Sequence, residues 1–290
     1  MMSCEPRLVF THIGKTAGSS VNAFLEQVSR FRGADMLTVR GPASLYAQRR
    51  HFGRVLHLQG LSPRSFDVVA GHIPFATARY YFMPAQFVTV LRDPRWQLIS
   101  NFCSQPPNKA IHRFNMDRFI PLMRANPNAE WAIDNMQTRM LCNDFRFCAP
   151  VTSAMLNDAK RNLQRYYSLV GDADDLPAFL AALARKCGAP GGELPRLNST
   201  GEYQQYVNDE HLHFCEQWSA FDMDLWAWAR SNLAERSDAA AGRIVALEPV
   251  LPSPGWVERA STQARVATHA ICLRLRGLLS RIQTFVRASM

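Results

Sequence analysis

The sequence Leu8-Val9-Phe10-Thr11-His12-Ile13-Gly14-Lys15-Thr16-Ala17-Gly18-Ser19-Ser20 joins an apolar run to a turn of small residues around one lysine. Apolar residues at helical spacing follow this turn, at Val21, Phe24, Leu25 and Val28. The stretch therefore predicts a strand, a short loop and a helix. The first backbone N–H groups of a helix have no partner within it, and the helix dipole adds positive potential there. Together with the charge of Lys15, this loop is typical of a phosphate-binding site.

The loop departs from the P-loop of nucleotide kinases and GTPases, whose motif is G-x-x-x-x-G-K-[ST]. Gly14-Lys15-Thr16 matches the end of that motif, but its first glycine would fall on Val9, inside the apolar run. The small residues follow the lysine instead, so the loop would close over the helix start. A P-loop-like ATP-dependent kinase stays an alternative, and so does an ordinary turn with a solvated lysine.

A second stretch, residues 87–100, reads Phe-Val-Thr-Val-Leu-Arg-Asp-Pro-Arg-Trp-Gln-Leu-Ile-Ser. Its first five residues suit a buried parallel strand, while Asp93 and Pro94 suit the cap and the first position of a helix. Arg92 would then lie at the carboxyl end of the strand, where open α/β sheets bind ligands. Arg92 and Ser100, which lies further along the helix, together suit a second phosphate group. Alternatively, Arg92 could pair with a carboxylate.

Taken together, the two stretches resemble the sulfotransferases that use 3′-phosphoadenosine-5′-phosphosulfate (PAPS), especially the carbohydrate branch with heparan sulfate and uronyl 2-O-sulfotransferases. Residues 12–20 are similar to the family's 5′-phosphosulfate loop, and Arg92 and Ser100 occupy the two key positions of its 3′-phosphate motif. Gln97 departs from the family, because it stands where a second arginine is usual. Other similar segments follow in family order, at residues 70–75 (GH-x-P-F), 135–139 (N-x-Q-T-R), 162–171 (NL…VG) and 197–200 (LN-x-T).

The resemblance implies a role for each matched residue. Lys15 would contact the bridging oxygen of PAPS and stabilise charge on the leaving phosphate. The loop amides and the hydroxyls of its small residues would hold the 5′-phosphate, and Thr200 would lie near the cofactor; the implied loop contacts are Gly14, Lys15, Thr16, Ala17, Gly18, Ser19 and Ser20. His72 is the candidate general base, because neutral imidazole accepts a proton near pH 7. A hydrogen-bonded structural histidine is the alternative.

Four further residues are candidate contacts to the acceptor: His12, Asn135, Gln137 and Arg139. His12 is a rival to His72 as the base, or it orients the loop. Asn135 and Arg139 are four residues apart on a predicted helix over 129–142, so they share a face, while Gln137 points elsewhere. These side chains would contact the acceptor or orient the cofactor loop, or they form a polar face that caps a helix bundle.

The order of the motifs predicts an α/β fold with a P-loop-like parallel sheet flanked by helices, with helical additions. The chain has 290 residues, of which we assign 1–250 to a PAPS-dependent sulfotransferase domain. Predicted strands lie at 7–13, 66–72, 87–92 and 166–171, predicted helices at 174–187 and 203–230, and insertions at 33–65 and 103–130. Residues 256–290 hold six arginines and one glutamate on a predicted amphipathic helix, which would pack, self-associate or lie on an anionic membrane.

The composition of the chain indicates which kinds of binding partner are favoured. The net charge of +9 favours anionic partners such as an acidic carbohydrate, while no nucleic-acid recognition motif is present. The resemblance implies PAPS, with its product PAP, as the cofactor. No metal-ligand spacing occurs, and no metal is expected. Seven cysteines without a C-x-x-C pair fit a reducing cytosol, although Cys142 and Cys148 could pair elsewhere. Without an apolar span or signal peptide, we expect a soluble, cytoplasmic, bacterial-type enzyme; a catalytically inactive nucleotide-binding protein is the other alternative.

Overall fold

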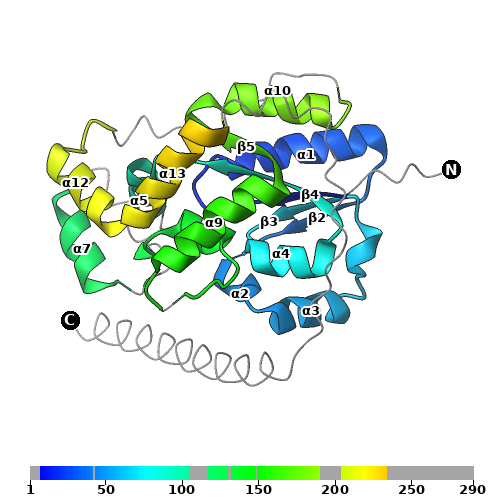
Figure 1. Cartoon of the computed structure of the whole chain (residues 1–290), viewed down its shortest axis with the longest axis horizontal. Helices are drawn as coiled ribbons and strands as arrows, with labels where there is room; N and C mark the ends of the chain where they lie inside the picture. Colours follow the sequence, from blue (N-terminus) through cyan, green and yellow to red (C-terminus); the bar gives the residue numbers. More distant parts are fainter. Residues whose placement is uncertain are drawn as a thin grey trace, which may run out of the picture. The chain divides into compact units, whose positions relative to one another are not determined.

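The computed structural model describes residues 7–41, 43–104, 116–127, 129, 132–147, 149–189 and 204–233. Its sheet has five parallel strands in the order β2-β3-β1-β4-β5 (Figure 1). The strands are β1 (Arg7–Thr11), β2 (Met36–Val39), β3 (Val68–Gly71), β4 (Ala85–Leu91) and β5 (Tyr167–Asp172). This architecture confirms the predicted α/β fold with a parallel sheet flanked by helices.

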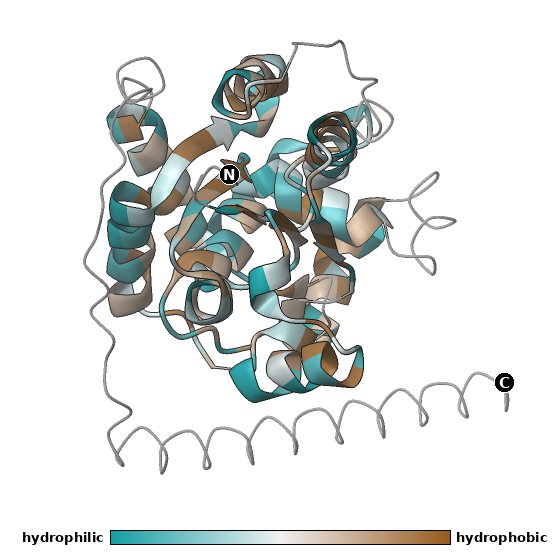
Figure 2. Ribbon diagram, turned by 90° about the vertical axis from the view of Figure 1, so that its right-hand side faces the viewer, coloured by the Kyte–Doolittle hydropathy of each residue, from teal (hydrophilic) through white to brown (hydrophobic). Residues whose placement is uncertain are grey.

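Helices cover both faces of the sheet. Side chains alternate between the two faces along each strand, and both faces carry apolar residues that pack against helices. Phe10, Ala70 and Val88 pack with α1 (Gly18–Arg32) and α10 (Leu176–Lys186). On the other face, Val9, Val69 and Phe87 pack with four helices, which are α4 (Phe75–Phe82), α8 (Met136–Leu141), α9 (Ser153–Tyr166) and α13 (Ala220–Leu233). In Figure 2 the helices around the sheet show both hydrophobic and hydrophilic residues, as expected for amphipathic helices on a sheet.

A smaller cluster lies beside the sheet. It joins α5 (Pro94–Ser104), α7 (Phe119–Ala125) and α12 (Asp209–Trp218) through Phe102, Phe119 and Phe214. The Phe102 and Phe119 rings meet edge to face, with their centroids 4.9 Å apart. This packing fixes α5, whose first turns carry Arg95, Gln97 and Ser100.

The region predicted as an insertion, residues 33–65, contains regular elements: β2, α2 (Ala43–Tyr46), α3 (Arg49–Leu58) and the 3₁₀ turn η1 (Pro63–Ser65). Phe52 and Leu56 lie one turn apart on α3 and are both buried, so an apolar stripe attaches this helix to the core. That residues 33–65 form an insertion over the cofactor site stays a prediction; the short elements of this region pack against the core.

Two predicted helices differ in extent. The helix expected over 129–142 begins only at Met136, because Asn135 has a φ of 49° and interrupts the helical backbone. The helix expected over 203–230 is two helices, α12 and α13, separated at Ser219. The prediction for 174–187 is confirmed by α10. Two 3₁₀ turns, η2 (Met116–Arg118) and η4 (Ala173–Asp175), also occur among the described residues.

Several predictions fall outside the described residues: Thr200, Cys148 and the helix predicted for 256–290. Among the residues that are described, no helix combines the length and apolar character needed to cross a bilayer. Four described cysteines are buried as free thiols, namely Cys103, Cys142, Cys187 and Cys215. Pairing of Cys142 with Cys148 therefore stays an open prediction.

Candidate functional site

A cavity of about 630 Å³ lies where β1, β3 and β4 end at their carboxyl edge. This is the edge at which open α/β sheets bind ligands. Ten of the predicted site residues line the cavity: His12, Gly14, Lys15, Ala17, Gly18, Ser19, Ser20, His72, Arg92 and Ser100. The fold thus brings together three separate segments of the sequence, around residues 12–20, 72 and 92–100.

The loop between β1 and α1 has a backbone shape that suits an anion. Lys15 and Ala17 have positive φ values of 65° and 64°, on either side of Thr16. Alternation of this kind directs successive backbone N–H groups into one concavity, and α1 begins directly after it at Gly18. The first turn of α1 has no acidic residue to repel an anion. Buried Thr16 does not line the cavity; its hydroxyl donates to the Ile13 carbonyl at 2.9 Å and stabilises the turn.

The carbonyl side of this loop is held by two side chains from the segment after β4. Arg92 Nη1 donates to the Lys15 carbonyl at 3.0 Å, and Gln97 Nε2 donates to the Gly14 carbonyl at 2.8 Å. Because these carbonyls are engaged on one side, the loop is held with a defined backbone orientation. Gln97 therefore contacts the loop. In the sequence, it stands out only as a departure from the pattern of the resembled family.

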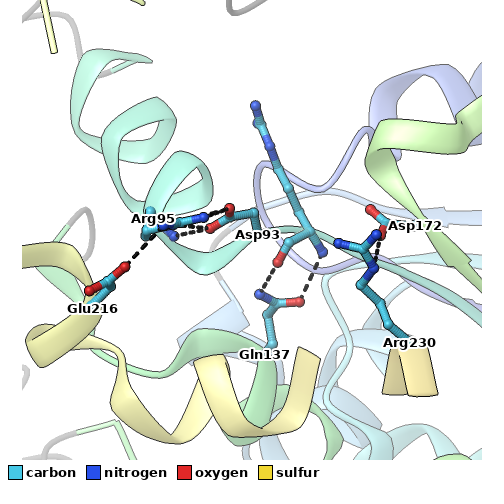
Figure 3. Close-up of polar contacts among 7 residues, drawn as sticks. Asp93, Arg95, Gln137, Asp172, Glu216 and Arg230 are labelled. Atoms are coloured by element: carbon cyan, nitrogen blue, oxygen red, sulfur yellow. Dashed lines mark hydrogen bonds and ion pairs between the residues drawn. The ribbon is translucent and has the colours of Figure 1, made fainter. Parts of the chain in front are cut away.

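Gln97 stands where the resembled family usually has a second arginine, and Arg95, two residues before it, does not take the place of that arginine. Arg95 forms ion pairs with Asp93 at 2.7 Å and with Glu216 on α12 at 3.0 Å (Figure 3). Asp93 also accepts from the Arg95 backbone N–H at 2.9 Å, which confirms its predicted capping position before Pro94. These contacts raise the pKa of Arg95 and join α5 to α12. Arg95 thus ties α5, which carries Gln97 and Ser100, to α12.

His72 and His12 form a stacked pair. Their ring centroids lie 4.1 Å apart with an interplanar angle of 25°. His72 Nδ1 lies 3.0 Å from the His12 backbone carbonyl. Since a carbonyl only accepts, Nδ1 of His72 must carry the proton, and Nε2 is the basic nitrogen of the neutral ring.

Burial keeps both imidazoles neutral. Desolvation lowers the pKa of His72, and the hydrogen bond to the His12 carbonyl opposes this effect only in part. Desolvation is the main cause that lowers the pKa of His12 well below its ordinary value, and its proximity to Lys15 and to the titratable ring of His72 adds to this effect. A buried, neutral His12 is thus a support for His72, and it also lines the cavity.

Gly18 gives His12 its space. A Cβ at position 18 would lie 1.8 Å from Cδ2 and 1.9 Å from Nε2 of the His12 ring. We expect Gly18→Ala to displace the buried ring, separate the stacked pair and cost about 1–3 kcal/mol of unfolding free energy. Chemical denaturation would measure this loss. Gly14→Ala is the comparison, because a Cβ there meets nothing within 4 Å; equal stability loss in both variants would contradict the steric explanation.

The three predicted residues around α8 have different places. Asn135 Oδ1 accepts from the Asp222 backbone N–H at 3.0 Å, and Arg139, whose side chain is 2% exposed, pairs with Asp134. Neither lines the cavity. Gln137 contacts the backbone of Arg92 (Figure 3). Asn135 and Arg139 thus belong to the helix packing, while Gln137 reaches the predicted phosphate site.

Asp222 is a cavity-lining residue without any signal in the sequence. Its carboxylate accepts from the backbone N–H groups of Gln137 and Thr138, at 2.9 and 2.7 Å, and burial raises its pKa to about 6. The sequence does not show that Asp222 binds the first turn of α8, because this contact depends on the packing of α13 against α8 in the fold.

No protein-family model and no curated protein matches the sequence. The site is therefore interpreted from its own residues. Within the described part of the chain, no three His, Cys, Asp or Glu side chains are placed to hold a metal ion.

Proposed function

We propose that the protein is a PAPS-dependent sulfotransferase that transfers a sulfuryl group to a hydroxyl of a carbohydrate. The observation that carries the proposal is the convergence of three groups on one cavity. The Lys15 loop follows β1, Arg92 follows β4, and the neutral imidazole of His72 follows β3. Two cationic places for phosphate groups and one base for a hydroxyl are the minimum that such a transfer needs.

The residues present fit PAPS in size and in chemistry. A volume of about 630 Å³ falls within the range of small-molecule pockets, which is roughly 300–1,000 Å³. The donors are backbone amides at a helix start, a lysine, an arginine and hydroxyls, which together suit phosphate oxygens. Among the described residues, three carboxylates line the cavity, those of Asp93, Asp174 and Asp222; Asp93 is paired with Arg95, and Asp222 accepts from backbone N–H groups.

When bound, PAPS supplies an activated sulfuryl group and a bisphosphate leaving group. The amides at the start of α1, with the hydroxyls of Ser19 and Ser20, would hold the 5′-phosphate. Arg92 and Ser100 would hold the 3′-phosphate. Lys15 places a positive charge where the leaving phosphate gains negative charge. Nε2 of His72 takes the proton of the acceptor hydroxyl.

A P-loop-like kinase and an inactive nucleotide-binding protein are the rival functions. Calorimetric titration with PAP and with ATP, each with and without Mg²⁺, separates the first rival. We expect PAP to bind without metal and ATP to bind weakly or not at all. Sulfate transfer from labelled PAPS to a panel of carbohydrates tests activity and excludes the second rival. Tight Mg²⁺-dependent ATP binding without PAP binding would contradict the proposal.

The proposed base predicts a pH dependence. Protonated His72 cannot accept a proton, and its pKa is lowered from 6.5 by burial, so the active neutral form persists below that pH. We expect kcat/KM for PAPS, which reports the free enzyme, to rise with pH along a limb whose midpoint lies below 6.5, the ordinary histidine value. Initial rates between about pH 5 and 8 would measure this limb. A limb centred above the ordinary histidine value would argue against His72.

A further inference from the structure

The amide group of Gln137 contacts both backbone groups of Arg92. Arg92 N–H donates to Oε1 at 3.1 Å, and Nε2 donates to the Arg92 carbonyl at 2.8 Å (Figure 3). Pairing of β4 with β5 ends at Leu91, so Arg92 lies just beyond the sheet ladder. The glutamine therefore continues the hydrogen bonding of β4 by one residue, in a place where no strand does so.

Gln137 is itself held in a fixed orientation. It is 1% exposed, and its backbone N–H donates to Asp222, as does that of Thr138. Asp222 is also 1% exposed, and its own N–H donates to Asn135 Oδ1. These reciprocal contacts join the first turns of α8 and α13. A buried amide with every neighbour fixed has one orientation, and both of its ends face Arg92.

Arg92 passes this constraint to the phosphate loop. Its guanidinium donates to the Lys15 carbonyl at 3.0 Å, and Lys15 has the left-handed backbone that shapes the loop. A shift of the Arg92 backbone would move this donor away from Lys15. The contacts thus run from Asp222 through Gln137 and Arg92 to the loop that begins α1.

We propose that Gln137 is a positioning residue for the phosphate site, which it serves by fixing the backbone of Arg92 so that the guanidinium holds the Lys15 loop. The activity side of this inference rests on the proposed function. Its structural side does not, because the loop can be observed in the ligand-free protein.

The test compares Gln137→Met with Asn162→Leu. Asn162 is a buried amide that donates to the Leu141 carbonyl at 2.8 Å, at the other end of α8, so its loss disturbs the same helix without touching Arg92. The first readout is amide hydrogen exchange at Ser20 and Val21, which donate to the Ala17 carbonyl at the loop's end. In ligand-free protein we expect exchange at these amides to quicken about tenfold in Gln137→Met and not in Asn162→Leu, as for the loss of one hydrogen bond.

The second readout is PAP affinity, measured by calorimetry beside the melting temperature. We expect Gln137→Met to weaken PAP binding about tenfold or more, and Asn162→Leu to leave it within about threefold at a similar loss of melting temperature. Gln137→Glu keeps the acceptor for Arg92 N–H and loses the donor, so it should fall between wild type and Gln137→Met. This variant also serves if Gln137→Met does not fold.

Each outcome decides between the two proposals. Loop exchange and PAP affinity that change equally in Gln137→Met and Asn162→Leu would show a merely structural role and overturn the inference. If wild-type protein fails to bind PAP, the proposed function fails, while the exchange comparison still supports or overturns the positioning role. A crystal structure of Gln137→Met that keeps the 3.0 Å contact between Arg92 Nη1 and Lys15 O would also overturn it.

Discussion

Lys15→Met is expected to lower kcat for sulfuryl transfer by about 10³-fold, as measured with labelled PAPS at saturation. Methionine keeps the length of the side chain and, as an L-residue, tolerates the φ of 65° no worse than lysine does. The backbone carbonyl that receives Arg92 Nη1 is retained. The lost quantity is therefore the positive charge at the leaving phosphate, which stabilises the transition state more than the ground state.

Lys160→Met is the matched control, because Lys160 lies on α9 outside the cavity lining. It should leave kcat unchanged, and Lys15→Arg should recover part of the lost rate because it restores a positive charge. If kcat of Lys15→Met stayed within about tenfold of wild type, Lys15 would not stabilise the leaving phosphate as proposed.

His72→Asn is expected to lower kcat by about 10²–10⁴-fold, while the dissociation constant for PAP changes little. The asparagine Nδ2 can still donate to the His12 carbonyl, in place of the His72 Nδ1 that does so now. The variant thus retains a donor at that contact and lacks the basic Nε2. Single-turnover rates with saturating PAPS and acceptor would measure the loss of the chemical step.

The control for this experiment is His57→Asn, because His57 is an exposed residue on α3. The acidic limb of the pH profile should also disappear in His72→Asn. Near-normal turnover in this variant would show that His72 is a structural residue, and His12 would then be the next candidate.

The sequence predicted the strands that carry strong local patterns. β1, β3 and β4 each contain a run of apolar or β-branched residues, and each of the four predicted strands starts within two residues of its predicted start. β2 was missed because it has four residues, only one of which is buried. The start of α8 at Met136 was missed for another reason, because the Asn135 side chain accepts from the backbone N–H of Asp222 on another helix.

In the candidate site, too, residues with a local sequence pattern were predictable and residues placed by distant contacts were not. The phosphate loop was predictable because its lysine, small residues and helix are adjacent in the sequence. Gln137 and Arg92, in contrast, are 45 residues apart, and their contact depends on how α8 packs against α13. The spacing of Asn135 and Arg139 suggested a shared functional face, but the structure buries both in helix packing. A side chain that binds backbone across the fold leaves no periodic signal.

The order of the strands sets a direction for the proposed transfer. β1 carries Lys15 in the middle, β4 on one side carries Arg92, and β3 on the other carries His72. If the nucleotide extends toward β4, the acceptor would approach from the β3 side, past the β2–α2 connection, in which Gly41 lines the cavity, as does Ala43 at the start of α2. Donor and acceptor recognition are then separate modules, and acceptor range could be redesigned at that connection with cofactor affinity unchanged.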